Sequence, residues 1–365
     1  MKKLIPISGL LMLSSCSFAA QERPSLEYNF PICGQSILNE KNITKVCATR
    51  DFIALEPRKR KRNWLAFMAA EGSGKYYGPI DRVGGILDFK NQELDMQGHV
   101  WDFSKQGGSG LTLRGHDSII RNGIILNTTP TLGGGMGGYI PPNFSTGKQK
   151  NNNVTKHGFL YAKEYSSGAY QGSIENFYFK DMKFTSYNFN LWSYGGGVFS
   201  SQFIVKNGMN VYGSKATILN NKIISYAELE TNNSLFPLIK LNKSNFIAHS
   251  QQIFPDANDD TTAIPSALYV KFSPGTVIDG NTFTLTQKND QAYAIVLDHS
   301  PRVRITNNTF NGFKVPILMD QWSSIVDEKG KEIKPEQFTG YGNIINPNEF
   351  AGHVTMNRKG EIVRK

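Results

Sequence analysis

Short runs of alternating apolar and polar residues recur along most of the chain, and they share a turn of Asn or Gly. The clearest copies are IDGNTF at 278–283 and ITNNTF at 305–310, which begin 27 residues apart. Alternation with a period of two is typical of a strand with one buried face, and Asn and Gly tolerate the left-handed backbone of a tight turn. The pattern predicts a solenoid of short stacked strands, because each repeat buries its apolar side against its neighbours. Further copies begin at Met96, Ile120, Phe179, Ile218 and Leu241.

A second element precedes the Asn turn in several repeats. It reads VKFS at 270–273 and LDHS at 297–300, so each repeat consists of strand, turn, strand, Asn-rich turn and strand. We expect Ile278 and Ile305 to point into the interior and Thr306 to point outward. Stacked asparagines are expected to hydrogen-bond from one repeat to the next.

These repeats resemble the right-handed parallel β-helix superfamily, which includes pectate lyases and related carbohydrate-active proteins. The resemblance implies an all-β fold, a single-stranded right-handed parallel β-helix over residues 84–320, with an N-terminal helical cap before it. It is specific for the fold and does not select one reaction, because a fold of this kind supports many activities.

The two ends of the solenoid are expected to be capped. In the segment 21–83, apolar residues at Trp64, Leu65, Phe67 and Met68 have helical spacing, which predicts an amphipathic capping helix over 51–70. The basic run RKRKR at 58–62 is either a binding site for anionic glycan or lipid phosphate, or a solvated face of that helix. Residues 321–365 are predicted to form a C-terminal cap or tail.

The first twenty residues have the features of an export signal. Lys2 and Lys3 precede an apolar run at 4–13, and small residues close the segment 1–20. Leu13-Ser14-Ser15-Cys16 resembles a bacterial lipobox, which implies cleavage before Cys16 and lipidation of that cysteine. The alternative is ordinary cleavage after Ala19 or Ala20. The protein is therefore predicted to be exported, as an outer-membrane lipoprotein or in the periplasm, with membrane contact through the lipid anchor alone.

Cysteine usage and charge fit an exported protein. The chain has 3 cysteines, so lipidation of Cys16 leaves Cys33 and Cys47, which we expect to form a disulfide in an oxidising compartment. The formal net charge is +10 over 365 residues. This excess favours anionic partners, an acidic polysaccharide first and lipid phosphate second, and outside the cytoplasm nucleic acid is not expected.

An acidic insertion between repeats contains the densest group of oxygen ligands. Asp256, Asn258, Asp259 and Asp260 fall within five positions and predict a Ca²⁺ site. Alternatively, Asp259 and Asp260 are the catalytic acid and base of a glycoside hydrolase, or the group is an acidic surface turn. Polygalacturonases of the resembled fold carry an adjacent aspartate pair, although the rest of their pattern is missing here. His249 opens the insertion and is a candidate base or metal ligand.

Elimination on a uronate requires a group that neutralises the carboxylate, a base and a proton donor. The candidate substrate-binding residues in the middle and late repeats are Lys240, Tyr269, Lys271, Arg302 and Arg304. Two functions remain open at this point. One is an enzyme that acts on an acidic polysaccharide as a lyase, hydrolase or epimerase. The other is a non-catalytic surface lipoprotein that binds glycan or a partner protein.

Overall fold

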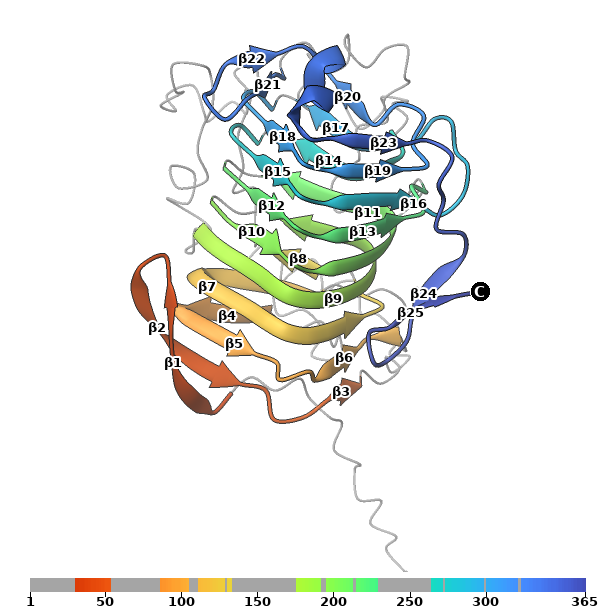
Figure 1. The fold of residues 1–365 in the computed structure, drawn as a ribbon. Helices are drawn as coiled ribbons and strands as arrows, with labels where there is room; N and C mark the ends of the chain where they lie inside the picture. The colour runs from red at the N-terminus through yellow and green to blue at the C-terminus, as the bar shows by residue number, and fades with distance from the viewer. Residues whose placement is uncertain are drawn as a thin grey trace, which may run out of the picture.

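In the part of the chain that it describes, the computed structural model consists mostly of β-strands (Figure 1). It describes residues 30–53, 86–104, 111–128, 130–132, 175–191, 195–212, 215–228, 264–271, 273–298, 300–320 and 323–365. Within these ranges a 21-stranded sheet is parallel throughout except for the pair β1–β2. The predicted all-β class and the parallel pairing are therefore confirmed. No helix in the same ranges is long and apolar enough to cross a membrane.

The sheet is organised as three ladders, in each of which parallel strands pair in series. Ladder 1 consists of β4 (Ile86–Lys90), β7 (Leu111–Leu126), β8 (Pro130–Leu132), β9 (Glu175–Leu191), β11 (Gln202–Tyr212), β14 (Ser266–Lys271), β17 (Tyr293–Asp298) and β20 (Ile317–Met319). Ladder 2 consists of β2 (Lys41–Cys47), β5 (Gln92–Asp95), β7, β9, β10 (Gly197–Phe199), β12 (Thr217–Leu219), β15 (Val277–Asp279) and β18 (Arg304–Thr306). Ladder 3 consists of β3 (Phe52–Ile53), β6 (Val100–Asp102), β7, β9, β11, β13 (Lys222–Ser225), β16 (Thr282–Leu285), β19 (Thr309–Asn311) and β23 (Ile344–Asn346). The long strands β7, β9 and β11 turn corners and so contribute to more than one ladder.

The inner faces of the ladders share one apolar core. In ladder 2, Ile278 pairs with Ile305, and both side chains are fully buried, which confirms their predicted orientation. The core of ladder 3 is largely aromatic. The rings of Phe184 and Phe203 stack with centroids 4.9 Å apart and an interplanar angle of 11°. Stacking of like residues at equivalent positions follows from parallel, in-register pairing, because each side chain meets its counterpart in the next repeat.

The turn between ladders 2 and 3 repeats the same conformation. Asn220, Gly280 and Asn307 have positive φ angles of 54°, 67° and 55°. The residue that follows each of them is a buried asparagine. The backbone N–H of each of these asparagines donates a hydrogen bond to the side-chain oxygen of the next asparagine in the series, at 2.9 to 3.0 Å. The asparagine ladder consists of Asn221, Asn281, Asn308 and Asn343. The expected stacking of asparagines is confirmed.

Thr306 adds one detail to the predicted pattern. The residue lies on the outer face of ladder 2, as alternation requires, but its side chain is only 5% exposed and its hydroxyl hydrogen-bonds the carboxylate of Asp279. Its outward orientation agrees with the expectation, but a polar neighbour one repeat away covers the side chain.

The described part of the N-terminal end differs from the prediction at residues 51–53. Phe30 packs against the core with its ring 6.3 Å from that of Phe89 and 6.2 Å from that of Trp101. Residues 51–53, which were assigned to the capping helix, instead contain β3. In this strand Phe52 is buried and pairs with Trp101. The remainder of the predicted helix, residues 54–70, lies outside the described residues.

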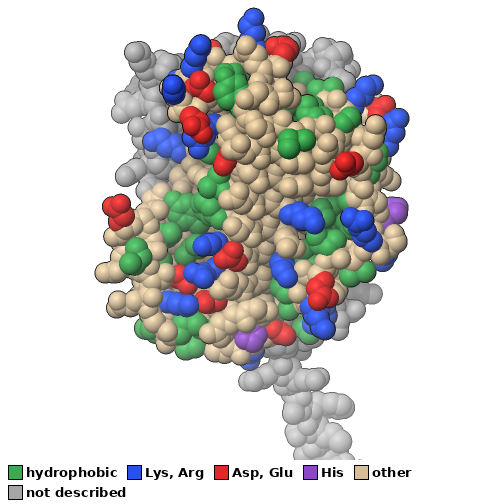
Figure 2. Space-filling view, in the orientation of Figure 1, with side chains coloured by type: hydrophobic (Ala, Val, Ile, Leu, Met, Phe, Trp, Pro, Cys, Tyr) green, Lys and Arg blue, Asp and Glu red, His purple; other side chains and the backbone are tan. Residues whose placement is uncertain are grey.

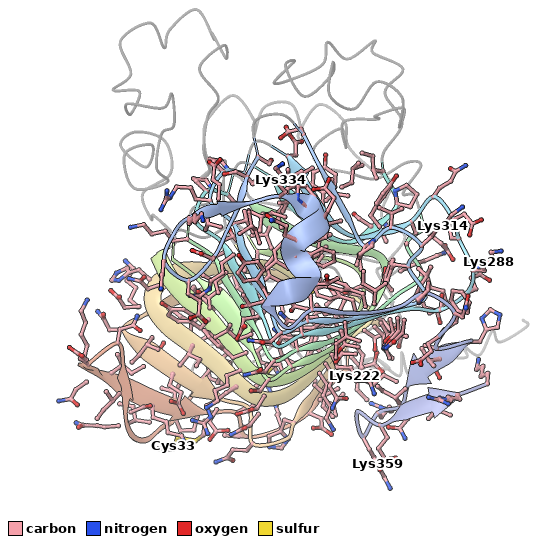
Figure 3. The ribbon with its side chains drawn as sticks, turned by 45° about the horizontal axis from the view of Figure 1, so that its top comes forward. Cys33, Lys222, Lys288, Lys314, Lys334 and Lys359 are labelled. Atoms are coloured by element: carbon pink, nitrogen blue, oxygen red, sulfur yellow. A yellow bond between two sulfur atoms is a disulfide. The ribbon has the colours of Figure 1, made fainter. Side chains whose placement is uncertain are left out.

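Parallel pairing extends beyond the predicted range 84–320 at both ends, from β2 to β23. Two short hairpins follow ladder 1: β21 (Ile325–Val326) with β22 (Glu332–Ile333), and β24 (Val354–Met356) with β25 (Ile362–Arg364). Figure 3 shows the 3₁₀ helix η3 (Pro335–Tyr341) lying across the end of the ladders. There the ring centroids of Phe338 and Phe310 are 6.0 Å apart.

The β24–β25 hairpin runs back along the outer face of ladder 3 (Figure 1). Val354 packs there against Ile204 and Ile224. The hydroxyl of Tyr226 donates a hydrogen bond of 2.6 Å to the carbonyl of Val354. Residues 321–365 therefore contain an end cap followed by an arm that covers part of one ladder.

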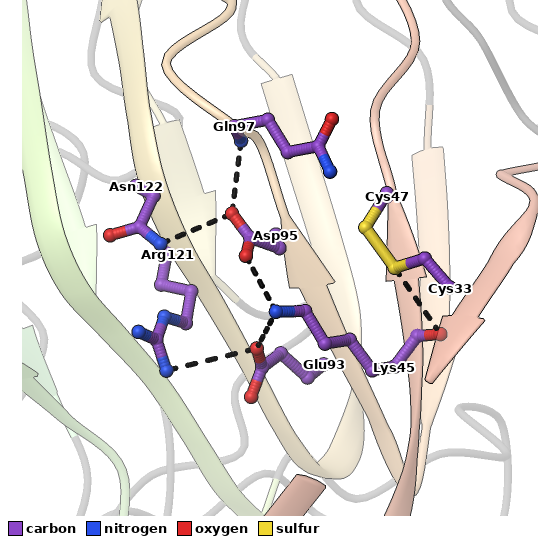
Figure 4. The surroundings of a disulfide bond; sticks show 8 residues. All are labelled: Cys33, Lys45, Cys47, Glu93, Asp95, Gln97, Arg121 and Asn122. Atoms are coloured by element: carbon purple, nitrogen blue, oxygen red, sulfur yellow. Dashed lines mark hydrogen bonds and ion pairs between the residues drawn. A yellow bond between two sulfur atoms is a disulfide. The ribbon is translucent and has the colours of Figure 1, made fainter. Parts of the chain in front are cut away.

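The predicted disulfide is confirmed. Cys33 of β1 (Ile32–Leu38) is bonded to Cys47 of β2, with the Cα atoms 5.9 Å apart (Figure 4). Beside it, the ammonium of Lys45 lies 2.7 Å from the carboxylate of Asp95 and 3.6 Å from that of Glu93. The hydrogen bond to Asp95 raises the pKa of Lys45. The disulfide closes the β1–β2 hairpin, and the ion pairs fix this hairpin to β5 of the first repeat.

We predict that the double variant Cys33→Ser/Cys47→Ser is less stable than the wild type by about 3 kcal/mol, because the disulfide closes a short loop and restricts the unfolded chain. The sequence separation that sets this loop is 14 residues. Urea denaturation measures the loss. The presence of the bond is checked by intact mass after alkylation without reductant, where two alkylated thiols would contradict the pairing.

We predict that Asn281→Ala lowers the free energy of unfolding by about 3 kcal/mol or more, because it leaves several buried polar groups without partners. Among them are the backbone N–H of Asn221 and the carbonyl of Ile218. The matched control is Asn220→Gly. Asn220 is an exposed neighbour with a positive φ angle, which glycine adopts readily, so the free energy of unfolding should change by no more than about 0.5 kcal/mol. Equal effects of the two variants would argue against a ladder that holds the repeats together.

Candidate functional site

The outer face of ladder 1 carries a group of acid–base side chains at β14, β17 and β20. Tyr269, Val296 and Leu318 are aligned by the register of these strands. Leu268 and Val270 belong to the core, so alternation turns Tyr269 to the outer face. Asp298 lies two residues after Val296 and faces the same way.

Tyr269 and Asp298 interact directly. The hydroxyl of Tyr269 donates a hydrogen bond of 3.0 Å to the carboxylate of Asp298. Both are buried, with 8% and 1% of their surface exposed. Burial raises the pKa of Tyr269 well above its ordinary value, and the nearby charges of Asp298 and Asp320 raise it further. The hydroxyl is therefore a protonated donor throughout the neutral range.

Asp320 brings a second carboxylate to the same face. Its backbone N–H donates to the carbonyl of Leu297 at 3.2 Å, which continues the pairing of β17 with β20 by one residue. This register sets Asp320 beside Asp298 on the neighbouring strand, at a strand spacing of about 4.8 Å. One oxygen of Asp320 accepts hydrogen bonds from the N–H and hydroxyl of Ser323, at 2.9 and 2.7 Å. We refer to Tyr269, Asp298 and Asp320 as the Tyr269 cluster.

A row of amides leads along the outer face to the cluster. Asn190 on β9 and Asn210 on β11 align with Tyr269 in the register of ladder 1. The amide of Asn210 donates a hydrogen bond of 2.9 Å to the side-chain oxygen of Asn190. Hydrogen-bonding groups thus recur at the strand spacing on the face that holds the cluster.

The predicted substrate-binding residues do not all converge. Tyr269 belongs to the cluster, and Lys271 is aligned with Asp298 at the end of β14, although its side chain lies outside the described part. Arg302 occupies the turn between ladders 1 and 2, with φ of 60° and its N–H bonded to the hydroxyl of Ser324 at 3.0 Å. Arg304 lies on ladder 2, where it pairs with Val277. The two arginines are therefore set on other surfaces than Tyr269.

Several predicted site residues lie outside the described residues. They are Cys16, Lys240, His249, Asp256, Asn258, Asp259 and Asp260. The predicted lipidation, the calcium site and the aspartate pair stay predictions. Within the described ranges, no group of three or more His, Cys, Asp or Glu side chains is arranged to hold a metal ion.

Asp298 and Asp320 were not among the predicted site residues. A signal for them was present in the sequence: VKFS, LDHS and MDQWS stand at equivalent places in three consecutive repeats. Aligning them places Lys271, Asp298 and Asp320 at one position of the repeat. The third copy is one residue longer than the first two, which obscures this equivalence in the sequence.

Comparisons of the chain with protein-family models, with curated proteins and with solved structures gave no match. A carboxylate that accepts a hydrogen bond from a protonated phenol, with a second carboxylate on the next strand, can accept and return protons. Because these groups are shielded from water, their mutual electrostatic effects are larger than they would be at a surface.

We predict a pH-dependent stability difference between the wild type and Tyr269→Phe. Because the folded-state pKa of Tyr269 is raised above its unfolded value of about 10, its stabilising contribution is complete below pH ~10 and is lost as the pH rises further. The destabilisation caused by Tyr269→Phe should therefore be largest at neutral pH and shrink between about pH 10 and 11. Denaturant unfolding at several pH values measures it. A difference that stays constant up to pH ~11 would contradict the burial of this hydroxyl.

Proposed function

We propose that the protein is an exported right-handed parallel β-helix, anchored to the outer membrane through lipid on Cys16. Support for the helical winding comes from three parallel ladders around one core and from a turn that recurs at Asn220, Gly280 and Asn307. The right-handed sense is implied by the resemblance of the repeats to that superfamily. Support for export comes from the leader at 1–20 and from a disulfide, which persists in oxidising compartments.

We infer that this β-helix acts on an acidic polysaccharide, and that the Tyr269 cluster supplies the acid–base groups. The observation that carries the inference is the 3.0 Å hydrogen bond from Tyr269 to Asp298, with the carboxylate of Asp320 on the adjoining strand. In this proposal Asp298 accepts the proton taken from the sugar, and the hydroxyl of Tyr269 donates a proton to the leaving oxygen. Lys271, aligned with Asp298, would neutralise the carboxylate of the substrate.

The extended outer face suits a polymer better than a small molecule. Asn190, Asn210 and Tyr269 present hydrogen-bonding groups at regular intervals of about 4.8 Å, the spacing of paired strands. A repeating ligand can contact such a row at several positions at once. The net charge of +10 favours an anionic polymer over a neutral one.

The test is turnover of uronate oligosaccharides by the wild type and by Asp298→Asn and Tyr269→Phe. Each variant keeps the shape of its side chain but removes a proton-transfer group, so we expect activity to fall by about 100-fold or more. Asp290→Asn is the matched control, because Asp290 is an exposed acidic residue beyond β16, and it should retain full activity. Ultraviolet absorbance of the product separates elimination, which creates an unsaturated sugar, from hydrolysis, which releases reducing ends alone. Full activity of Asp298→Asn would refute the assignment.

Burial of the cluster supports a second candidate, a non-catalytic surface lipoprotein that binds glycan or a partner protein. Asp298 and Asp320 are 1% and 2% exposed, and Tyr269 and Ser323 already donate hydrogen bonds to them. A cluster whose carboxylates already accept hydrogen bonds in this way can stabilise ladder 1 without contacting a ligand. Under this alternative, the wild type binds uronate oligosaccharides without turnover, and Asp298→Asn lowers stability instead of activity.

A further inference from the structure

Two aromatic rings lie side by side on the outer face of ladder 2, away from the Tyr269 cluster. Tyr178 on β9 and Phe199 on β10 have ring centroids 5.6 Å apart and an interplanar angle of 47°. Both side chains are half-buried and belong to no core cluster. In Figure 2 the left part of the visible face, over the strands of ladder 2, carries an apolar patch with basic and acidic side chains along its lower border.

A glycine leaves room for the ring of Phe199 to lie against the sheet. Gly197 precedes it by two residues and pairs with Tyr178. A Cβ atom at Gly197 would lie 3.2 Å from two ring carbons of Phe199 and 2.4 Å from the carbonyl oxygen of Thr217. The ring therefore folds back over a position without a side chain. The ring remains half-exposed on the outer face of ladder 2.

Cationic and amide groups border the two rings. Lys180 pairs with Phe199 on one side and with Arg121 of β7 on the other. Lys180 is exposed and has no ion pair with any described residue. The Nε of Arg121 is buried without a hydrogen-bond partner, and its Nη1 lies 3.8 Å from Glu93. On the opposite side, the amide of Asn39 donates to the hydroxyl of Tyr178 at 3.1 Å, which holds that ring in place.

We propose that Tyr178 and Phe199 form a stacking platform for a sugar ring of an anionic glycan, with Lys180 and Arg121 as the partners of its carboxylate. The apolar C–H face of a sugar packs on an exposed aromatic face, and a cation beside it pairs with an acidic substituent. The combination selects a uronate over a neutral sugar. Because the platform lies on ladder 2 and the Tyr269 cluster on ladder 1, it is a holding site separate from the acid–base groups.

The proposal rests on the proposed function only for the class of ligand, and binding is measured independently of turnover. Titration calorimetry with a uronate oligosaccharide is performed on the wild type and on Phe199→Ala, Tyr178→Ala and Lys180→Gln. We expect each aromatic variant to bind about tenfold more weakly, the size of one aromatic contact. Lys180→Gln should weaken binding of the uronate and reduce its dependence on salt, and leave binding of a neutral oligosaccharide of equal length unchanged.

Two matched controls separate the platform from general effects of truncation. Phe350→Ala removes another partly exposed ring, and Lys314→Gln removes another exposed cation, both remote from β9 and β10. They should bind the uronate as the wild type does, and thermal melts should confirm that all variants fold. Wild-type affinity in both Phe199→Ala and Tyr178→Ala, or absence of uronate binding by the wild type, overturns the platform. Full turnover in Asp298→Asn, together with weakened binding in Phe199→Ala and Tyr178→Ala, would refute the acid–base assignment and leave the platform supported, so the two proposals fail separately.

Discussion

The structure depends on the need of buried amide groups for hydrogen-bond partners. Asn221, Asn281, Asn308 and Asn343 lie inside a turn where water cannot reach them, so each must be satisfied by protein groups. The partner of each asparagine is supplied by the repeat beside it, at distances of 2.9 to 3.0 Å. A shift of one residue between repeats would leave these amides unpaired. The register that results aligns side chains on the outer faces, and the rows that form the candidate sites follow from it.

The sequence predicted the interior better than the surface. Ile278, Ile305 and the asparagines were placed correctly, because a buried position in a repeat depends on the repeat alone. Thr306 lies on the outer face as expected, but its outward side is covered by Asp279, which alternation cannot indicate. The expected helix at 51–70 included Phe52, whose apolar side chain suits a helix face and a buried strand equally well.

The candidate site was predicted in part, and the failures share a physical cause. The chain turns a corner every few residues, so Tyr269 and Arg304 lie on different surfaces although both belong to consecutive repeats. Residues 20 to 30 positions apart, in contrast, become neighbours: Asp298 is 29 residues from Tyr269. Reasoning from local clusters favoured the aspartates at 256–260. Reasoning from equivalent positions in the repeats would have favoured Asp298 and Asp320.

The returning C-terminal hairpin changes how such a stack of repeats can come apart. A stack in which each repeat contacts its neighbours alone can unravel from an end, one strand after another. Here the contact between Tyr226 and Val354 spans 128 residues, and Arg358 reaches Asp102 at 3.9 Å. A pulling force on the last strand is therefore transmitted first to the middle and early repeats. Before the final repeats can peel away, the hairpin must detach from ladder 3. The C-terminal end of the stack is thus mechanically coupled to its middle and early repeats.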